Sequence, residues 1–436
     1  LAEGCKPKPA WRIGTEHEKF PFFVEDNSPV PYDGDRSIRA LLEGMREKLG
    51  WTPIMDEGRI IGLYEPTGMG AISLEPGGQF ELSGAPLETI HETCSEVNGH
   101  LREVREVADR IGAGFLGLGF SPKWSLEDTP MMPKARYKLM KAYMPKVGTL
   151  GHQMMFRSCT VQTNLDFASE ADMAKKFRVS LALQPVATAL FANSPFAGGR
   201  DTGYLSFRSE IWRNTDDDRT GMLPFVFEPG FGFERYADYA LDVPMYFVIR
   251  DHKYVNVAGE SFRDFLDGRL PQLPGEKPTI KDWEDHLSTL FPEVRLKQFL
   301  EMRGADMGDE AHVVALSAFW TGLLYDDIAL EGAWELVRNW TNDDREHLRR
   351  EVPRLGLDTP FDRSSLFDVA AQAVGIAEAG LVRRNRLNAK GQDETIYLAP
   401  LEETVRRGKV PAQRWLDKFH GEWKGDLTQI FKEAEL

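Results

Sequence analysis

Apolar residues recur along the chain with two different spacings, and these spacings predict helices and strands respectively. The clearest helix is predicted over residues 90–111, where apolar residues return every three or four positions with charged residues between them. Similar spacing predicts helices over 170–190, with a kink or break at Pro185, and over 309–326, 334–352 and 365–383. The last third of the chain, from about 309 to 436, is therefore predicted to be mostly helical.

Short stretches in which polar and apolar residues alternate predict β-strands. They cover residues 13–20, 79–83, 158–166, 204–212 and 299–303. Because long helical stretches separate them, strands that are adjacent in the sequence need not be paired. We expect an α+β fold in which an antiparallel sheet carries helices on one side, and a single domain that spans residues 1–436.

One glycine-rich stretch matches a nucleotide-binding motif in the wrong context. Gly112-Ala-Gly-Phe-Leu-Gly117 fits the GxGxxG dinucleotide fingerprint, which requires a strand before it and a helix after it. Here a predicted helix precedes the glycines, and an apolar stretch that ends at Pro122 follows them. We interpret the motif as a helix end that leads into a strand.

Composition narrows the classes of function. The chain of 436 residues has 53 Lys and Arg against 68 Asp and Glu, and its net charge of −15 argues against nucleic acid or an anionic membrane as a partner. The longest uncharged apolar stretch, Val313 to Tyr325, is shorter than the roughly 20 residues of a membrane-spanning helix and predicts a buried core helix. Three cysteines without CxxC spacing, and an N-terminus without the layout of a signal peptide, indicate a reducing compartment, and we expect the cytoplasm.

The first candidate for chemistry is the acidic pair in Gly14-Thr-Glu16-His-Glu18. In a strand, residues i and i+2 share a face, so the two carboxylates lie about 6.5 Å apart along the strand. Two like charges at that distance disfavour each other unless a cation lies between them. We interpret the pair as a magnesium site, and the alternative is a solvated strand edge.

A second candidate lies in Leu74-Glu75-Pro-Gly-Gly-Gln79-Phe-Glu81-Leu-Ser. Glu75, Gln79 and Glu81 fall on one parity and apolar residues on the other, which is typical of a strand between a core and a site. The two glycines permit close approach of another group to the backbone. The reading as a further metal ligand competes with a β-bulge that leaves Glu81 in water.

A third candidate pair, Glu301 and Arg303, shares one face of the strand predicted over 299–303. The pair is consistent with one metal ligand and one phosphate contact, but a plain ion pair is favoured. A fourth group contains Arg136, the strand residues Gln162 and Asn164, and Arg208 with Trp212. Taken singly, each of these is a surface arginine or a core amide.

Taken together, the four groups predict a sheet face rich in acids that repel one another unless cations are bound. Magnesium with oxygen ligands, and nucleotide phosphates as its partners, fit such a face. The chain has neither the GxxxxGK[ST] phosphate loop nor the set of kinase motifs. We therefore expect an ATP site of another type, built on the sheet.

Longer motifs that contain these residues resemble one family. IGTEHEKF, SLEPGGQFELSGAPLETIHETC, MPKARY, CTVQTNLDF, IWRNTDDDRTGMLPF, FPEVRLKQFLEMRGAD and AFWTGLLYD are similar, in this order, to glutamate–cysteine ligases of the plant and proteobacterial type. The resemblance runs from about residue 11 to near the C-terminus.

The resemblance implies a fold and a reaction. The fold is a curved antiparallel sheet with surrounding helices, related to the catalytic domain of glutamine synthetase. The reaction is the ATP- and Mg²⁺-dependent ligation of L-glutamate, through its γ-carboxylate, to L-cysteine. It passes through a γ-glutamyl phosphate, yields γ-glutamylcysteine, ADP and phosphate, and is the first step of glutathione biosynthesis.

The resemblance also implies residue roles. The metal-binding acids are Glu16, Glu18, Glu81 and Glu301, with Glu75 as an addition. Arg303 contacts phosphate, Arg208 holds a substrate carboxylate, and the candidates for contact with ATP are Arg136, Gln162, Asn164 and Arg303. The walls of the amino-acid pockets are Trp212, Met155 and Tyr246.

Alternatives and one departure from the family accompany this interpretation. A related ligase with another amine acceptor, a Mg²⁺-dependent phosphotransferase and a non-catalytic amino-acid-binding protein are the competing functions. Plant enzymes carry two regulatory disulfides. Here Cys94 matches one of those cysteines, but Val314 occupies the position of its partner, and Val257 and Gln272 occupy the positions of the other pair. We therefore predict no disulfide switch. We expect a monomer or a homodimer.

Overall fold

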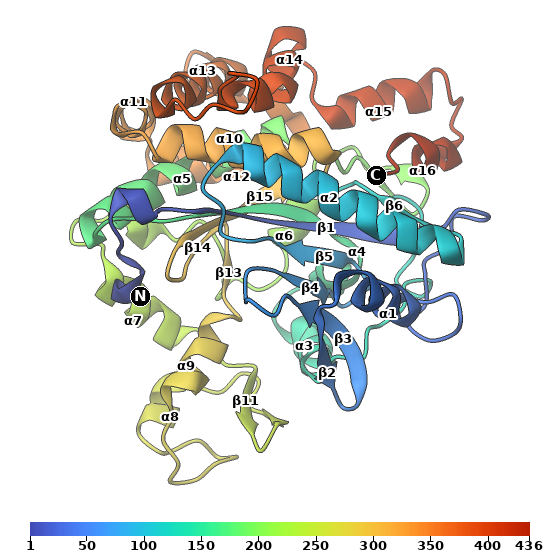
Figure 1. The fold of residues 1–436 in the computed structure, drawn as a ribbon. Coiled ribbons are helices and arrows are strands. Elements are labelled where there is room, and N and C mark those ends of the chain that lie inside the picture. Colours follow the sequence, from blue (N-terminus) through green and yellow to red (C-terminus); the bar gives the residue numbers. More distant parts are fainter.

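A nine-stranded sheet lies at the centre of the computed structural model, which describes residues 1–436 (Figure 1). The order is β14–β15–β7–β1–β5–β4–β3–β2, with β6 paired to the C-terminal half of β1, and every pairing is antiparallel. The strands are β1 (Ile13–Phe23), β2 (Thr52–Asp56), β3 (Arg59–Tyr64), β4 (Ala71–Leu74), β5 (Phe80–Ser83), β6 (Ala113–Leu116), β7 (Thr160–Leu165), β14 (Val294–Leu296) and β15 (Leu300–Asp306). This confirms the predicted antiparallel sheet.

Residues of β1 alternate between two environments, as the sequence predicts. Thr15 and His17 are buried, and the Thr15 hydroxyl lies 2.7 Å from that of Ser317 on the helix behind the sheet. Glu16 and Glu18 point to the opposite, open face, where they line a cavity. The period of two along a strand therefore separates the core from the site.

Three helices cover the face of the sheet to which Thr15 and His17 point. They are α2 (Ile90–Ala108), α5 (Glu170–Leu190) and α10 (Glu310–Leu324), and α5 continues past Pro185 without ending there. Residues 312–324 of α10 are all buried, which confirms the predicted core helix. No single helix is long and apolar enough to cross a membrane, and only α10 and α11 pass that test as a pair, with a bend of 91° between them.

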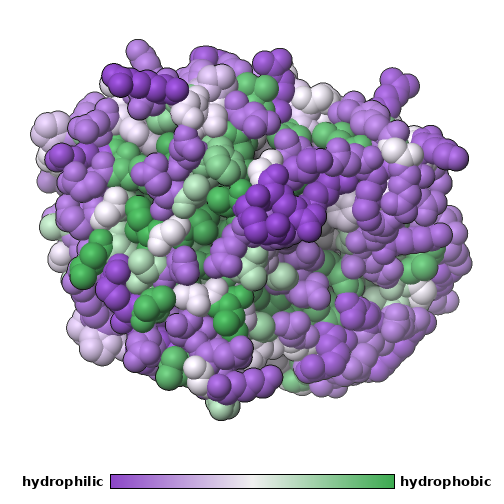
Figure 2. All heavy atoms as spheres, turned by 90° about the horizontal axis from the view of Figure 1, so that it is seen from above, coloured by the Kyte–Doolittle hydropathy of each residue, from purple (hydrophilic) through white to green (hydrophobic).

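A further helical layer lies outside α10 and contains most of the last third of the chain (Figure 1). Its helices are α11 (Asp327–Val337), α13 (Leu366–Arg384), α14 (Ala399–Arg407) and α15 (Pro411–His420). Two further helices of this part of the chain lie elsewhere: α12 (Asn342–Leu355) packs on α5, and α16 (Ile430–Glu433) packs beside β1, with Phe431 against Phe22. Seen from above, the outer surface of the molecule is largely hydrophilic, with apolar side chains in small separate groups (Figure 2). A core of 101 buried residues runs from Trp11 to Leu436 and joins these layers to the sheet.

Helices also lie over the open face, so the expectation of helices on one side only is wrong. The helices α3 (Ala135–Val147), α4 (Gly151–Arg157) and α6 (Phe207–Trp212) line the cavity above the acids. The helix α1 (Ile38–Leu49) does not line the cavity and packs on α2 and β3. A lower segment contains α7 (Phe233–Asp242), β11 (Phe247–Arg250), β12 (Lys253–Asn256), α8 (Phe262–Leu266) and α9 (Ile280–Leu287). Three two-residue pairs complete the fold: β8 (Phe196–Ala197) with β9 (Arg200–Asp201), β10 (Thr220–Gly221) with β13 (Phe291–Pro292), and β16 (Pro360–Phe361) with β17 (Ser364–Ser365).

Two predicted elements differ from the structure. The strand expected over 204–212 is instead helix α6, because the Ser206 side chain caps the backbone N–H of Ser209 and starts a helical turn. The single helix expected over 334–352 is two helices, since Thr341 and Asp344 form a capping box that begins α12 after α11 has ended. Gly112, by contrast, ends a helical turn with φ of 68° and leads directly into β6, which confirms the interpretation of the GxGxxG match.

Candidate active site

A cavity of about 290 Å³ lies on the open face of the sheet, above β1, β5 and β7. Strands form its floor, and the helices α3, α4 and α6 form its walls. Most of the predicted site residues line it: Glu16, Glu18, Glu75, Glu81, Arg136, Met155, Gln162, Arg208, Trp212 and Arg303. Residues far apart in the sequence are thus brought to one place by the antiparallel pairing.

Three of the acids lie on neighbouring strands. Glu18 of β1 stands directly opposite Glu81 of β5, and Glu16 is the next residue on the same face of β1. Their carboxylates accept hydrogen bonds from neutral donors only: Asn164 Nδ2 to Glu16 at 2.8 Å, the backbone N–H of Thr160 to Glu18 at 3.0 Å, and Ser73 Oγ to Glu81 at 2.5 Å. We call Glu16, Glu18 and Glu81 the acid cluster.

The acid cluster carries unfavourable charge. Burial raises the pKa of Glu16, and repulsion from Glu301 and Glu81 adds to this effect. Burial likewise raises the pKa of Glu18 well above the usual range, with further contributions from Glu75 and Glu81. The pKa of Glu81 is raised first by burial and then by Glu75. No Lys or Arg forms an ion pair with any of the three carboxylates.

Glu301 lies in a different electrostatic environment on the same face. Arg295 donates to both of its carboxylate oxygens, at 2.6 and 2.9 Å, while Lys297 lies 2.9 Å and Arg303 2.7 Å away. Burial alone would raise the pKa of this fully buried carboxyl, but Arg295, Lys297 and Arg303 together hold it well below its usual range. The structure therefore shows the ion pair that was the favoured reading of Glu301 and Arg303, and metal binding by Glu301 stays a prediction.

The two candidate arginines meet through the backbone of β15. Arg303 donates to Gln162 Oε1 at 2.5 Å, and its carbonyl oxygen accepts from Arg208 Nη2 at 3.0 Å. Arg208 is buried, and its Nε has no partner in the protein. A shift of register between Met302 and Ala305 exposes this carbonyl to Arg208, since regular pairing with β7 is interrupted there.

The remaining predicted residues divide between the walls of the cavity and positions outside it. Met155 and Trp212 line it, and the indole Nε1 of Trp212 is without a partner. Arg136 also lines it, with its guanidinium 5.4 Å from the centre of the Phe247 ring. Glu75 lies in the loop after β4, with its carboxylate 3.4 Å from the Tyr137 hydroxyl.

Tyr246 does not line this cavity, so its predicted role as a pocket wall does not fit the structure. It is fully buried, and its ring stacks on the Arg219 guanidinium at 3.9 Å. The family resemblance, and no pattern in the local sequence, was the basis for placing Tyr246 at the pocket.

A second cavity, of about 500 Å³, borders the first. Glu16 lines both cavities, and Asn164 lines only the second. Basic side chains of Lys6 and Arg12 line it as well, together with Gly68 and Gly70 from the loop between β3 and β4. Of the acid cluster, Glu16 thus lies at the boundary between the two cavities, while Glu18 and Glu81 line the first alone.

Several site residues escaped the sequence reasoning. Arg295 and Lys297 neutralise Glu301, Lys134 lines the cavity near Glu75, and Ser73 and Thr160 bind the acid cluster. A signal for Arg295 and Lys297 exists in Val-Arg-Leu-Lys, where two cations alternate just before Leu300-Glu-Met-Arg303. Recognition of a tight hairpin between these segments would have paired them with Glu301, as the structure does.

Two solved structures share this fold. The glutamate–cysteine ligase of Francisella tularensis in complex with AMP matches with a TM-score of 0.57 and 11% identity, over 97% of this chain and 87% of that one. A bifunctional glutathione synthetase from Pasteurella multocida matches with a TM-score of 0.53 and 13% identity, over 96% of this chain and 51% of that one. The α+β sheet with its helices is therefore the fold of a class of ligases, which confirms the predicted fold class.

Sequence comparison identifies the family within that class. The profile of glutamate-cysteine ligase family 2 (GCS2) matches residues 12–433. Chloroplastic glutamate–cysteine ligase B of Oryza sativa subsp. japonica is 55% identical over 99% of this chain and 85% of the relative. The chloroplastic enzymes of Nicotiana tabacum and Arabidopsis thaliana are each 56% identical over 99% of this chain and 81% of the relative. The chain belongs to glutamate–cysteine ligase family 2, which confirms the resemblance of its motifs.

The same comparison corrects one expectation. The expected cytoplasmic location is wrong, because these relatives are named as chloroplastic enzymes. The low cysteine count on which it rested indicates a reducing compartment without saying which one. Cys5, Cys94 and Cys159 are free thiols in the structure, and the absence of a disulfide switch stays a prediction.

Proposed function

We propose that this chain joins the γ-carboxyl group of L-glutamate to the amino group of L-cysteine at the expense of ATP. The γ-carboxylate attacks the γ-phosphorus of ATP, the bond to the bridging oxygen breaks, and ADP leaves. The amine of cysteine then attacks the acyl phosphate, the amide forms, and phosphate and a proton are released. The product is γ-glutamylcysteine, the first intermediate of glutathione biosynthesis.

The acid cluster is the single observation that carries this proposal. A transferring phosphoryl group and two carboxylate substrates bring several negative charges together, and an acidic floor opposes them unless cations intervene. Glu81 is buried, Glu16 and Glu18 are half-buried, and all three have raised pKa values and no ion pair with a basic side chain. This pattern supports a cation site rather than a salt-bridge network. Arg295, Lys297 and Arg303 lie on the same side of the sheet, but they form ion pairs with Glu301.

The donor set fits Mg²⁺, which prefers oxygen ligands and commonly keeps several waters with one or two carboxylates. Glu16, Glu18 and Glu81 are the residues that would hold it, with Glu75 in reach of the same cavity. No three acidic, His or Cys side chains converge on one point in this arrangement, so water and phosphate oxygens would have to complete the coordination. Bound there, Mg²⁺ would neutralise the charge that develops during phosphoryl transfer.

The two cavities support a division of the substrates. The first, with Arg208, Trp212 and Met155, suits the amino acids, because a guanidinium binds a carboxylate bidentately beside apolar walls. The second, with Lys6, Arg12 and Asn164, suits the nucleotide. Glu16 at their boundary then lies where the γ-phosphate meets the γ-carboxylate, and Arg303 is near enough to contact phosphate.

Phosphate release tests the proposal directly. Purified protein with ATP, Mg²⁺ and L-glutamate should form ADP, strong stimulation by L-cysteine is expected, and mass spectrometry should detect γ-glutamylcysteine. ADP formation that ignored both amino acids, or a stable phosphorylated product, would refute it and favour a phosphotransferase. Stimulation by another amine with cysteine inert would support the related ligase with a different acceptor.

A further inference from the structure

The helix α6 carries two residues of the cavity wall but is too short to hold itself in place. It spans six residues, Phe207–Trp212, and places both Arg208 and Trp212 at the cavity. A helix of this length closes very few internal hydrogen bonds, so its position depends on contacts from outside.

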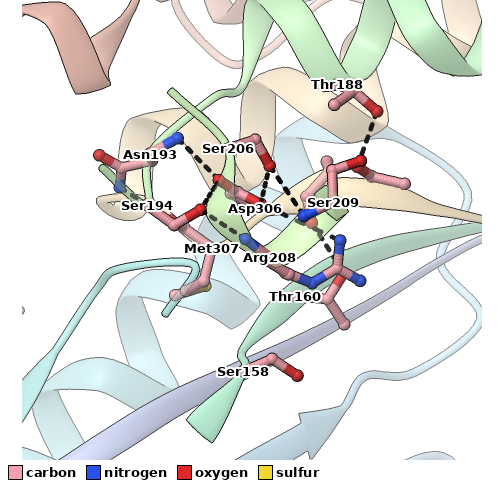
Figure 3. Close-up of polar contacts among 12 residues, drawn as sticks. Ser158, Thr160, Thr188, Asn193, Ser194, Ser206, Arg208, Ser209, Asp306 and Met307 are labelled. Carbon is pink, nitrogen blue, oxygen red and sulfur yellow. Dashed lines mark hydrogen bonds and ion pairs between the residues drawn. The ribbon is translucent and has the colours of Figure 1, made fainter. Parts of the chain in front are cut away.

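Those contacts converge on one buried carboxylate. Asp306, the last residue of β15, is 2% exposed and accepts three hydrogen bonds: from the backbone N–H of Asn193 at 2.8 Å, from Ser194 Oγ at 2.6 Å and from Ser206 Oγ at 2.9 Å (Figure 3). The backbone of Gly119 packs closely against this side chain, since a Cβ added at Gly119 would lie 2.4 Å from the Asp306 Cγ.

The two serines pass this anchoring on to the first turn of α6. Ser194 Oγ accepts the backbone N–H of Arg208 at 3.1 Å, and Ser206 Oγ accepts that of Ser209 at 3.2 Å. Each hydroxyl donates to Asp306 and accepts from the helix, so a single carboxylate orients both acceptors. An acidic group below a helix start also matches the polarity of that end.

The Arg208 side chain is fixed by the same strand. Its Nη1 lies 4.0 Å from Asp306 Oδ1, and its Nη2 donates to the carbonyl of Arg303 at 3.0 Å. The Nε has no partner in the protein, so the guanidinium keeps donor capacity for a ligand. Backbone and side chain of Arg208 therefore both depend on the end of β15.

We propose that Asp306 is a positioning residue that holds α6, through Ser194 and Ser206, so that Arg208 presents its free donors to the α-carboxylate or γ-carboxylate of glutamate. The inference rests on the proposed function of Arg208. It adds that the strand that carries Glu301 and Arg303 also sets the distance between the phosphate end and the amino-acid end of the site.

Asp306→Asn tests this directly, because it keeps the volume but turns one acceptor oxygen into a donor that faces a serine hydroxyl. The KM for glutamate should rise about 10- to 100-fold, while the KM for ATP stays within about twofold. In an Arg208→Lys background, the same substitution should change the glutamate KM by less than about twofold, because its effect passes through Arg208.

A matched control separates positioning from general loss of structure. Glu394 is fully buried and accepts from the backbone N–H of Ile90 at the start of α2 and from Arg384, remote from both cavities. Glu394→Gln should lower the melting temperature and leave the glutamate KM unchanged. The inference would be overturned if Asp306→Asn raised the KM values for glutamate and ATP equally. It would also be overturned if Glu394→Gln raised the glutamate KM as much as Asp306→Asn does, or if Asp306→Asn had its full effect in the Arg208→Lys background.

Calorimetric titration with glutamate keeps this test independent of turnover. If the wild-type chain bound glutamate but formed no ADP, the proposed reaction would fail, and the loss of affinity in Asp306→Asn would still support positioning. A wild-type chain that bound no glutamate would overturn both.

Discussion

Glu301 and the acid cluster lie on one face of one sheet, but their electrostatic surroundings are opposite. Glu301 on β15 is surrounded by Arg295, Lys297 and Arg303, and its pKa is held low in spite of burial. The acid cluster on β1 and β5 receives only neutral donors, and its pKa values are raised. Basic residues thus stabilise the first group within the chain, while the second is left to be stabilised from outside.

This difference separates a structural ion pair from a candidate ligand site, although both contain glutamates. Glu301 and Glu81 are buried, whereas Glu16 and Glu18 are half-buried. The count of cationic partners separates the two cases more sharply than exposure does, since Glu301 has three and the acid cluster has none. An uncompensated buried charge destabilises a fold and is retained where a ligand supplies the missing charge.

The largest effect is expected from neutralising the acid cluster. Glu18→Gln or Glu81→Gln keeps the volume and removes one of the proposed cation ligands, so kcat should fall by about two to three orders of magnitude. Steady-state phosphate release measures this at saturating Mg²⁺. Glu96→Gln is the control, because Glu96 is a half-buried acid with a raised pKa that lines neither site cavity, and its turnover should be near normal. Near-normal turnover in both cluster variants would remove these residues from the site.

The next effect concerns stability on the compensated side. Arg295→Met leaves Glu301 with two cations in place of three, and the free energy of unfolding should fall by about 3 kcal/mol. Denaturant titration measures it. Arg406→Met, which breaks an exposed pair with Glu403, should cost less than about 1 kcal/mol. Equal costs for the two variants would mean that the charge balance at Glu301 has no special weight.

The two groups also predict opposite dependences on pH. The folded pKa values of the acid cluster lie above the usual 4.5, so without metal this contribution to stability is present below pH 4.5 and is lost as pH rises through the raised values. The folded pKa of Glu301 lies below 4.5, so its contribution is present above that pH and is lost as pH falls.

Melting temperatures with EDTA and with Mg²⁺ test this expectation. The stabilisation by Mg²⁺ should be several degrees larger at pH 8 than at pH 5.5, because protons compete for the cluster at the lower pH. Taking the difference between the two conditions cancels the buried histidines His17 and His100, whose lowered pKa values act equally in both. A stabilisation that did not vary with pH would contradict the assignment of the cluster as the binding site.

The smallest effect is expected at Tyr246, which lies outside the cavity. Tyr246→Phe removes a hydroxyl whose partner is the Met144 sulfur and keeps the ring on Arg219, so the KM values for glutamate and cysteine should stay within about twofold. Trp212→Phe, which changes the cavity wall, should raise at least one of them by more. A larger effect from Tyr246→Phe would restore it as a pocket residue.

Much of the site could be predicted from the sequence because strands have a strict period. The parity of Glu16 with Glu18, and of Glu81 against Phe80 and Leu82, follows from two-residue alternation, and the structure places those acids on the open face. The compensation of Glu301 could not be predicted in the same way. It depends on the hairpin between β14 and β15, whose register is a tertiary fact.

The helix α6 shows a second limit. Phe-Arg-Ser-Glu-Ile-Trp does not alternate strictly, and the sequence reasoning missed the helix cap by Ser206 just before it. The contacts of Ser194 and Asp306 that anchor this helix come from elsewhere in the chain. The short strands β2, β3 and β4 were missed for a related reason, since they have few residues and are stabilised by pairing with one another.

Direct metal binding tests the central claim that the acid cluster is completed by a cation. Mn²⁺ is a spectroscopic substitute for Mg²⁺, and electron paramagnetic resonance counts free Mn²⁺ during titration of the protein. We expect saturable Mn²⁺ binding that is displaced by Mg²⁺. Glu18→Gln and Glu81→Gln should each weaken this binding strongly, and Glu96→Gln should leave it unchanged. Equal binding by all four proteins would contradict the central claim.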